Sequence, residues 1–174
     1  GGNESISVAG RSLIIGWRVL RLFNNQADSI TDHLLDTRAP IIARPEVLEQ
    51  VVSDAAGHVT ALALPSETFT RPQYNFRMNG QVIEVVRMPA AHSGGDSAVR
   101  FAGSDVVATG AIFDDTHFPV IDLRHGGSLQ GEIDALNQLM NTLTVAPVPL
   151  VDDSGGTRVI PVHGPACDQA DLLV

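Results

Sequence analysis

Hydrophobic and polar positions form their clearest pattern after Pro40, where short apolar runs alternate with turn residues. Ile41-Ile42-Ala43 predicts a short buried strand. Pro45 fits the first turn of a helix, and the helix predicted over Glu46 to Ser53 has one apolar side, formed by Val47, Leu48, Val51 and Val52. Ala55-Ala56-Gly57 is expected to end this helix.

A β-hairpin is predicted next, after a loop rich in Pro, Ser and Thr over Leu64 to Pro72. Tyr74, Phe76 and Met78 alternate with polar residues, as in a strand with one buried face. Asn79-Gly80 suits the positive φ angles of a type I′ turn, and Val82 to Met88 predicts the returning strand. Two further strands are predicted over Ser97 to Phe101 and Val106 to Thr109, with a turn at Ala102 to Asp105 between them.

The clearest helix begins after Ser128, a residue type that favours the N-cap position. Its apolar residues recur with the 3.6-residue period, at Leu129, Ile133, Leu136 and Leu139 or Met140. Val145 to Gly156 is rich in Pro and Gly and predicts a surface connection. Thr157 to Pro161 predicts a last strand, and Asp168 is expected to cap a helix near the end of the sequence.

The first 40 residues have a less distinct pattern. Ser12 to Phe23 is apolar on nearly all sides and fits a buried strand pair or a short helix. It contains two arginines and is shorter than the roughly 20 apolar residues of a membrane-spanning helix, so we expect no membrane span here. Ala27 to Leu35 is weakly helical, and polar side chains with helical spacing suggest a metal site or, as we prefer, a solvated helix face; they are Asp28, Asp32, His33 and Asp36.

The composition of the chain limits the kinds of protein it can be and the partners it can have. The 174 residues are 44% hydrophobic, enough for the core of one domain, and we treat the chain as a single soluble domain. Its net charge of −9 disfavours nucleic acid and anionic membranes as partners.

The single cysteine, Cys167, excludes an internal disulfide. Cys167 could be a nucleophilic thiol or an ordinary loop residue, and we prefer the second interpretation. Periplasmic and cytoplasmic locations stay open.

Four segments that carry polar or glycine residues lie after the C-terminal ends of predicted strands or in the loop beyond them. Three of them are His92-Ser93-Gly94-Gly95-Asp96, Gly110-Ala111-Ile112-Phe113 and Val162-His163-Gly164-Pro165, and the fourth is the loop Pro119 to Ser128. Side chains from separate strands can converge at such ends.

These segments resemble motifs of metallo-β-lactamase-fold hydrolases. Ala91 to Asp96 is similar to "AHTxGD", Thr109 to Phe113 to "TGDLF", and Val159 to Pro165 to "VIPGHGP". Phe118 to Asp122 with Gly126-Gly127-Ser128 resembles the "YPFID…GGS" of one bacterial subgroup. The resemblance is best over Val82 to Val174. It is loose over residues 5–70, and its poorest part is residues 1–40. Gly1 to Glu4 resembles the residues that come directly after the family's HxHxDH motif, and that motif would precede Gly1.

The resemblance implies an α/β fold, an αββα sandwich that is incomplete at the N-terminus. It also implies zinc at one rim of the sheets and a metal-bound hydroxide that attacks an ester, amide or thioester of a small-molecule substrate. Carried over by position, His92 and His163 are the zinc ligands that remain. Ala111 stands where the family has its metal-bridging aspartate, so the resemblance predicts an incomplete metal site.

Other polar residues of these loops have two interpretations each. Asp114, Asp115 and His117 lie near the missing carboxylate and are either substitute ligands or a solvated acidic loop, which we prefer. Asp96 is expected as a turn or supporting residue, Asp122 as a loop-fixing residue and Ser128 as the helix cap.

Two hypotheses remain for the function. In the first, the chain is part of a zinc-dependent hydrolase and is inactive alone. In the second, it is a non-catalytic binding or assembly module that keeps the fold. With strands expected upstream of Gly1, an uncovered sheet edge and the apolar run Leu13 to Phe23 predict self-association.

Overall fold

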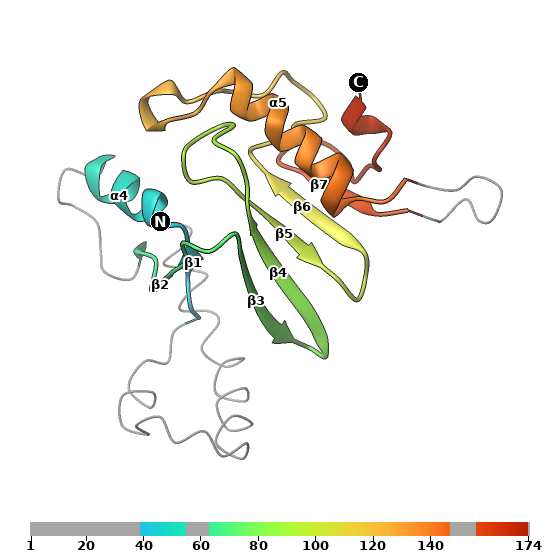
Figure 1. The fold of residues 1–174 in the computed structure, drawn as a ribbon, viewed down its shortest axis with the longest axis horizontal. Helices are drawn as coiled ribbons and strands as arrows, with labels where there is room; N and C mark the ends of the chain where they lie inside the picture. The colour runs from blue at the N-terminus through green and yellow to red at the C-terminus, as the bar shows by residue number, and fades with distance from the viewer. Residues whose placement is uncertain (1–38, 55–62, 147–155, 174) are drawn as a thin grey trace, which may run out of the picture. The chain divides into compact units, whose positions relative to one another are not determined.

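The computed structural model describes residues 39–54, 63–146 and 156–173. The chain divides into two compact units, one of Gly1–Ala43 with Leu48–Thr68 and one of Arg44–Val47 with Phe69–Val174. Figure 1 shows the helices and strands of both units. The sequence-based features at Ser12 to Phe23, Ala27 to Leu35 and Ala55 to Gly57, including Asp28, Asp32, His33 and Asp36, lie outside the described residues.

In the first unit, β1 (Ile42–Ala43) pairs in parallel with β2 (Glu67–Thr68). The backbone N–H groups of Ser66 and Glu67 both donate to the carbonyl of Ile41, at 2.9 and 3.2 Å. The sequence predicted β1 but not β2, which lies in the predicted loop. Helix α4 (Pro45–Asp54) begins at the predicted proline; its residues up to Val47 belong to the second unit and the rest to the first.

The second unit contains a five-stranded sheet in the order β3-β4-β5-β6-β7. Its strands are β3 (Gln73–Met78), β4 (Gln81–Arg87), β5 (Ser97–Phe101), β6 (Val106–Gly110) and β7 (Arg158–Pro161). Neighbours are antiparallel except β6 and β7, which are parallel. Asn79 and Gly80 have φ of 52° and 81°, which confirms the predicted turn of the β3–β4 hairpin.

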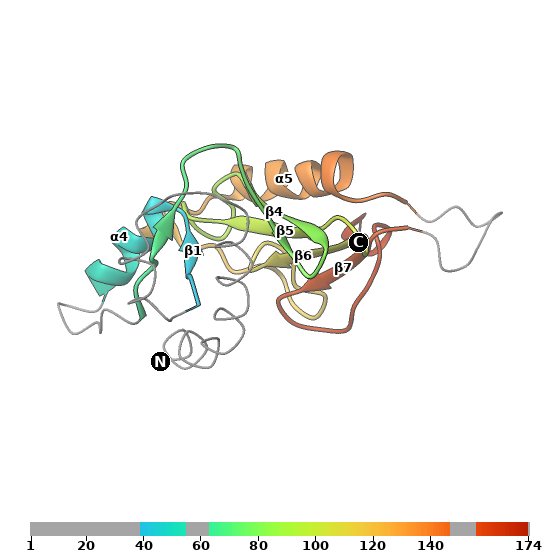
Figure 2. The same cartoon turned by 90° about the horizontal axis from the view of Figure 1, so that it is seen from below.

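Helix α5 (Leu129–Gln138) continues as a π-helical turn, Leu139–Leu143, and lies along one face of this sheet in Figure 2. The core between them takes one row of side chains from the strands, Val86, Ala98, Val107 and Val159, and from α5 and its extension Ala135, Leu139 and Leu143. A last 3-10 turn, Asp171–Leu173, adds Leu172 to this cluster. It is shorter than the helix predicted here, and Asp168 accepts from Ala170 N–H at 2.7 Å just before it.

The predicted apolar side of α5 is only partly the buried one. Leu129 and Ile133 are 66% and 47% exposed, whereas Gly131, Glu132 and Ala135 are buried. The reason is the close approach of α5 to the loop after β4: a Cβ at position 131 would overlap the backbone carbonyl of Ala90. Small residues therefore decide which face of α5 meets the sheet.

No helix within the described ranges is long and apolar enough to cross a membrane.

Candidate functional site

Three strands of the second unit end at the same edge of the sheet. β4 is antiparallel to β5, β5 is antiparallel to β6, and β6 is parallel to β7, so β4, β6 and β7 run in one direction. The loops after them carry His92, Ala111 and His163, respectively (Figure 1). Adjacent strands are about 4.8 Å apart, so three spacings, roughly 14 Å, separate the ends of β4 and β7. The loops have to lean toward each other for His92 and His163 to meet.

Asp96 fixes the loop after β4. Its buried carboxylate accepts from Ala91 N–H at 3.1 Å, from Ser93 N–H at 3.0 Å and from the Ser93 hydroxyl at 2.8 Å. The backbone carbonyl of Asp96 accepts from Met88 N–H at 3.1 Å. These bonds use the carboxylate within its own loop, which confirms the prediction of a turn residue.

His92 is half-buried and held from two sides. Its Nδ1 lies 2.6 Å from the carbonyl oxygen of Val120, and its own carbonyl accepts from Asp122 N–H at 2.8 Å. Because a carbonyl can only accept, Nδ1 carries the hydrogen, and in the neutral ring Nε2 keeps the lone pair. A Cβ at Gly127 would overlap the carbonyl of His92, so glycine is required there. The ring is oriented as a ligand imidazole commonly is.

The loop before α5 contains Asp122, whose carboxylate accepts from Arg124 N–H at 3.0 Å and lies 2.6 Å from Nδ1 of His125. The hydrogen bond from His125 is the main cause that lowers the pKa of Asp122 below its usual 3.8. The Ser128 hydroxyl accepts from Gly131 N–H at 2.9 Å. Both roles match the predictions, a loop-fixing aspartate and a helix cap.

His163 lies on an exposed turn just after β7. Its carbonyl accepts from Asp115 N–H at 3.2 Å, and Val162 N–H donates to the carbonyl of Phe113 at 2.9 Å. Gly164 has a φ of 102° and lies against the side chain of Asp115. The turn after β7 and the loop after β6 therefore run side by side.

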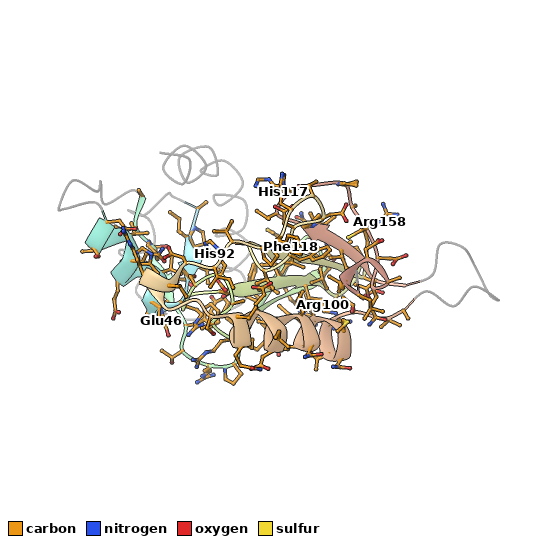
Figure 3. All side chains as sticks on the ribbon, turned by 90° about the horizontal axis from the view of Figure 1, so that it is seen from above. Glu46, His92, Arg100, His117, Phe118 and Arg158 are labelled. Carbon is orange, nitrogen blue, oxygen red and sulfur yellow. The ribbon has the colours of Figure 1, made fainter. Side chains whose placement is uncertain are left out.

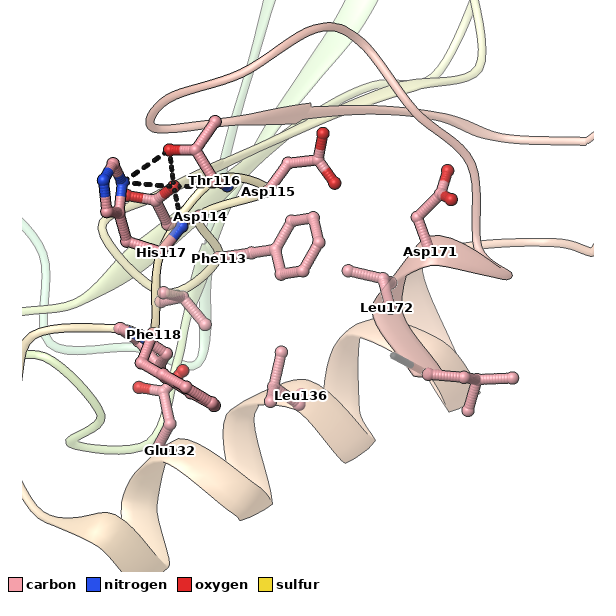
Figure 4. Close-up of a pocket in the computed structure, with 13 residues that line it drawn as sticks. Phe113, Asp114, Asp115, Thr116, His117, Phe118, Glu132, Leu136, Asp171 and Leu172 are labelled. Atoms are coloured by element: carbon pink, nitrogen blue, oxygen red, sulfur yellow. Dashed lines mark hydrogen bonds and ion pairs between the residues drawn. The ribbon is translucent and has the colours of Figure 1, made fainter.

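Asp114 organises the loop after β6. Its carboxylate accepts from Thr116 N–H at 2.8 Å, from the Thr116 hydroxyl at 2.6 Å and from His117 N–H at 3.1 Å (Figure 4). The Thr116 bonds lower the pKa of Asp114, and the charge of His163 adds to the shift. Asp115 and His117 are exposed. In Figure 3, His117 and His92 lie apart, on different loops.

The donors in this region do not form a zinc site by themselves. Ala111 offers no ligand atom, and Asp114 is occupied within its own loop. Across residues 39–54, 63–146 and 156–173, no three His, Cys, Asp or Glu side chains group in a way that could hold a metal ion. A catalytic zinc normally has three protein ligands, so His92 and His163 do not fit that metal without others.

Cys167 is an inward-facing structural residue. Its backbone pairs with Val159, and its thiol lies 3.7 Å from the Val159 carbonyl oxygen. Burial raises the pKa of the thiol to about 11, and the carboxylates of Asp171, Asp115 and Asp168 contribute to the rise. A thiol so rarely ionised is a poor nucleophile, which agrees with the interpretation of an ordinary loop cysteine.

Sequence reasoning missed Glu132, the buried acid in the first turns of α5. Only 3% of this residue is exposed, and neither carboxylate oxygen has a hydrogen-bond partner among the described residues. Burial, with a smaller effect of the Asp96 charge, raises its pKa to about 7. Its neighbour Gly131 and the small Ala135 were the available signal, because they indicate the close-packed face of the helix.

No protein-family model matches the chain, and no curated protein matches it in sequence. Solved structures do match its fold. A metallo-β-lactamase from Pontibacter korlensis is 18% identical with a TM-score of 0.56, and 78% of this chain covers 55% of that one. The DIM-1 metallo-β-lactamase exposed to ceftazidime is 15% identical (TM-score 0.55, 77% and 53% covered), and the metallo-β-lactamase IND-7 is 16% identical (TM-score 0.55, 76% and 53% covered).

The chain therefore has an α/β metallo-β-lactamase-like fold, as the motifs predicted. It spans little more than half the length of these structures. At such identities the likeness concerns the architecture, and the chemistry has to be argued from the residues.

Proposed function

We propose that this chain is part of a metal-dependent hydrolase and that it contributes His92 and His163 to a zinc site. The observation that carries the proposal is the common direction of β4, β6 and β7, since His92 and His163 both lie after strands that end at one edge of the sheet. Support comes also from the orientation of His92, whose Nδ1–H donates to Val120 and leaves Nε2 available to a metal.

The reaction proposed for the whole protein is hydrolysis of an ester, amide or thioester of a small molecule. This chain by itself is proposed to be inactive. Two imidazoles are fewer than the three protein ligands of a typical catalytic zinc, and Ala111 supplies none. The missing ligands have to come from outside the described residues.

A zinc titration of the chain and its variants tests the proposal. Two ligands give weak binding, and we expect a dissociation constant above roughly 10 µM for the unaltered chain. Ala111→Asp adds a carboxylate between the two histidines in the sheet order, and we expect it to tighten zinc binding at least about tenfold. That gain should vanish in Ala111→Asp combined with either His92→Ala or His163→Ala, and it should survive His117→Ala as the matched control.

Two results contradict the proposal. If Ala111→Asp leaves zinc affinity unchanged, the strand-edge positions do not face a common metal. If the unaltered chain binds zinc stoichiometrically at submicromolar concentration and His117→Ala abolishes the binding, the ligands are in the loop after β6 instead.

The replacement at Ala111 also favours a second candidate, a non-catalytic binding module that retains the fold. Hydrolysis assays with a generic ester and a β-lactam separate the two. They are run on a longer chain in which the zinc ligands are complete except at position 111. Activity there supports the hydrolase, and tight zinc binding without turnover supports the module.

A further inference from the structure

A pocket of about 470 Å³ lies between the first turns of α5, the loop after β6 and the final 3-10 turn (Figure 4). Apolar side chains form much of its wall, among them Phe113, Leu136 and Leu172. Its volume falls within the range of roughly 300–1,000 Å³ that is usual for sites of small organic ligands. His92, Ala111 and His163 do not line it. The pocket adjoins the proposed metal site, because Asp115 of its lining donates its backbone N–H to the carbonyl of His163.

The charged groups of this pocket are mostly acidic. Four carboxylates line it, from Asp114, Asp115, Glu132 and Asp171, and no arginine does. His117 is the basic side chain of the lining, and its ring is exposed and lies 2.7 Å from the Thr116 hydroxyl. The potential inside the pocket therefore favours a cation.

The burial of Glu132 and its lack of hydrogen-bond partners are what point to a ligand in this acidic pocket. Only 3% of it is exposed, it lines the pocket, and both of its oxygens lack a partner among the described residues. Figure 4 draws its carboxylate pointing from α5 toward the loop that carries Phe118. A buried carboxylate without a donor is costly, and the cost disappears when a cation or a hydrogen-bond donor pairs with it.

The other carboxylates differ from Glu132 in this respect. Asp114 accepts three hydrogen bonds within its loop, and Asp171 accepts from Asp168 N–H at 3.0 Å. Asp115 is exposed, so water can solvate its carboxylate. Glu132 is the member of the set that is both buried and without a hydrogen-bond partner among the described residues.

We infer that this pocket binds a small organic cation, an ammonium or amidinium group on an apolar body, with Glu132 as its counter-ion. The apolar body packs against Phe113, Leu136 and Leu172, and the charged end lies toward α5. The aromatic ring of Phe113 adds a favourable surface for a cation that passes over it. The Glu132 oxygens are buried from water, so binding requires the side chain to adopt another staggered rotamer that brings its carboxylate to the ligand.

Calorimetric or NMR titration with phenethylammonium tests this, with 2-phenylethanol as a neutral probe of nearly the same shape. EDTA is present throughout, so metal binding does not contribute and the result is independent of the proposed function. We expect the cation to bind at least about tenfold more tightly than the alcohol, because charge-assisted hydrogen bonds are the stronger ones. Both ligands should shift NMR signals of Phe113 and Leu136.

Glu132→Gln keeps the shape of the side chain and removes its charge. We expect this variant to bind the cation about as weakly as the alcohol and to leave alcohol binding unchanged. Asp134→Asn, on the exposed side of the same helix, is the matched control and should alter neither. Equal affinity of the unaltered chain for cation and alcohol would overturn the inference without any variant, as would tight cation binding that Glu132→Gln leaves intact.

Discussion

Asp96 and Glu132 are two buried carboxylates of the same unit with opposite surroundings. Asp96, 9% exposed, accepts hydrogen bonds from Ala91 and Ser93, whose donors lie within five residues of it. Glu132, 3% exposed, accepts none from the described residues. The first carboxylate is part of the loop that it stabilises. The second is a cost to the fold, which the ligand inferred above would offset.

Asp96→Ala is expected to lower the stability of the fold more than the other substitutions. The variant leaves two buried backbone N–H groups and a hydroxyl without their acceptor, and we expect a loss of about 3–4 kcal/mol in the free energy of unfolding. Urea denaturation followed by circular dichroism measures it. A loss below about 1 kcal/mol would mean that water replaces the carboxylate and that the two acids have more similar surroundings than their contacts indicate.

Gly131→Ala tests the close approach that buries Glu132. Helix propensity alone predicts a gain of about 1 kcal/mol. The overlap of the new Cβ with the Ala90 carbonyl involves backbone and cannot be relieved by a side-chain rotation, so we expect a net loss of about 2 kcal/mol. Asn137→Ala, on the exposed side of α5, is the control and should be neutral or stabilising. A stabilised Gly131→Ala would show that α5 does not sit this close to the loop.

Glu132→Gln should stabilise the chain at pH 8 by about 1 to 2 kcal/mol, because it removes an unpaired buried charge. The pKa of Glu132 is raised from 4.5 to about 7, so the folded state binds the proton more tightly than the unfolded state. The stability that Glu132 contributes is therefore complete below pH 4.5 and falls as pH rises to about 7. Asp114 and Asp122 have lowered pKa values and titrate below this window.

Urea midpoints of the unaltered chain and Glu132→Gln between pH 4 and 8 isolate this contribution, since all other groups are common to both. The difference should favour Glu132→Gln increasingly up to about pH 7 and then level off. A difference that does not change with pH would contradict the raised pKa.

Ile133→Ala should have the smallest effect, below about 1 kcal/mol, because Ile133 is 47% exposed. Leu139→Ala, at a fully buried position of the same apolar series, should cost about 3 kcal/mol. Thermal denaturation of both variants is sufficient. Similar losses of stability in the two variants would mean that Ile133 is buried, as the apolar periodicity of the sequence predicted.

The fold was predictable wherever its determinants are local. Asn79-Gly80 specifies the β3–β4 turn, and Ser128 specifies the start of α5, because the positive φ and the cap depend on neighbouring residues alone. Asp96 was likewise assigned a turn role, which the hydrogen bonds within its loop confirm.

Features that the sequence did not reveal depend on packing between distant segments. The buried face of α5 results from the contact of Gly131 with Ala90, far earlier in the chain, and periodicity alone favoured Leu129 and Ile133. Glu132 was overlooked because a glutamate in a helix is usually solvated. Its burial here depends on the same packing of α5. The metal role of His92 and His163 stays a prediction.

The pKa of Glu132 is the most direct test of the contrast between the two acids. Side-chain carboxyl signals of a ¹³C-labelled chain, measured by NMR from about pH 3 to 9, give it without any substitution. We expect a midpoint near 7 that falls when phenethylammonium is added, because a bound cation favours the charged carboxylate. A midpoint near 4.5 that the cation does not move would show a solvated or already paired carboxylate, and the contrast with Asp96 would be lost.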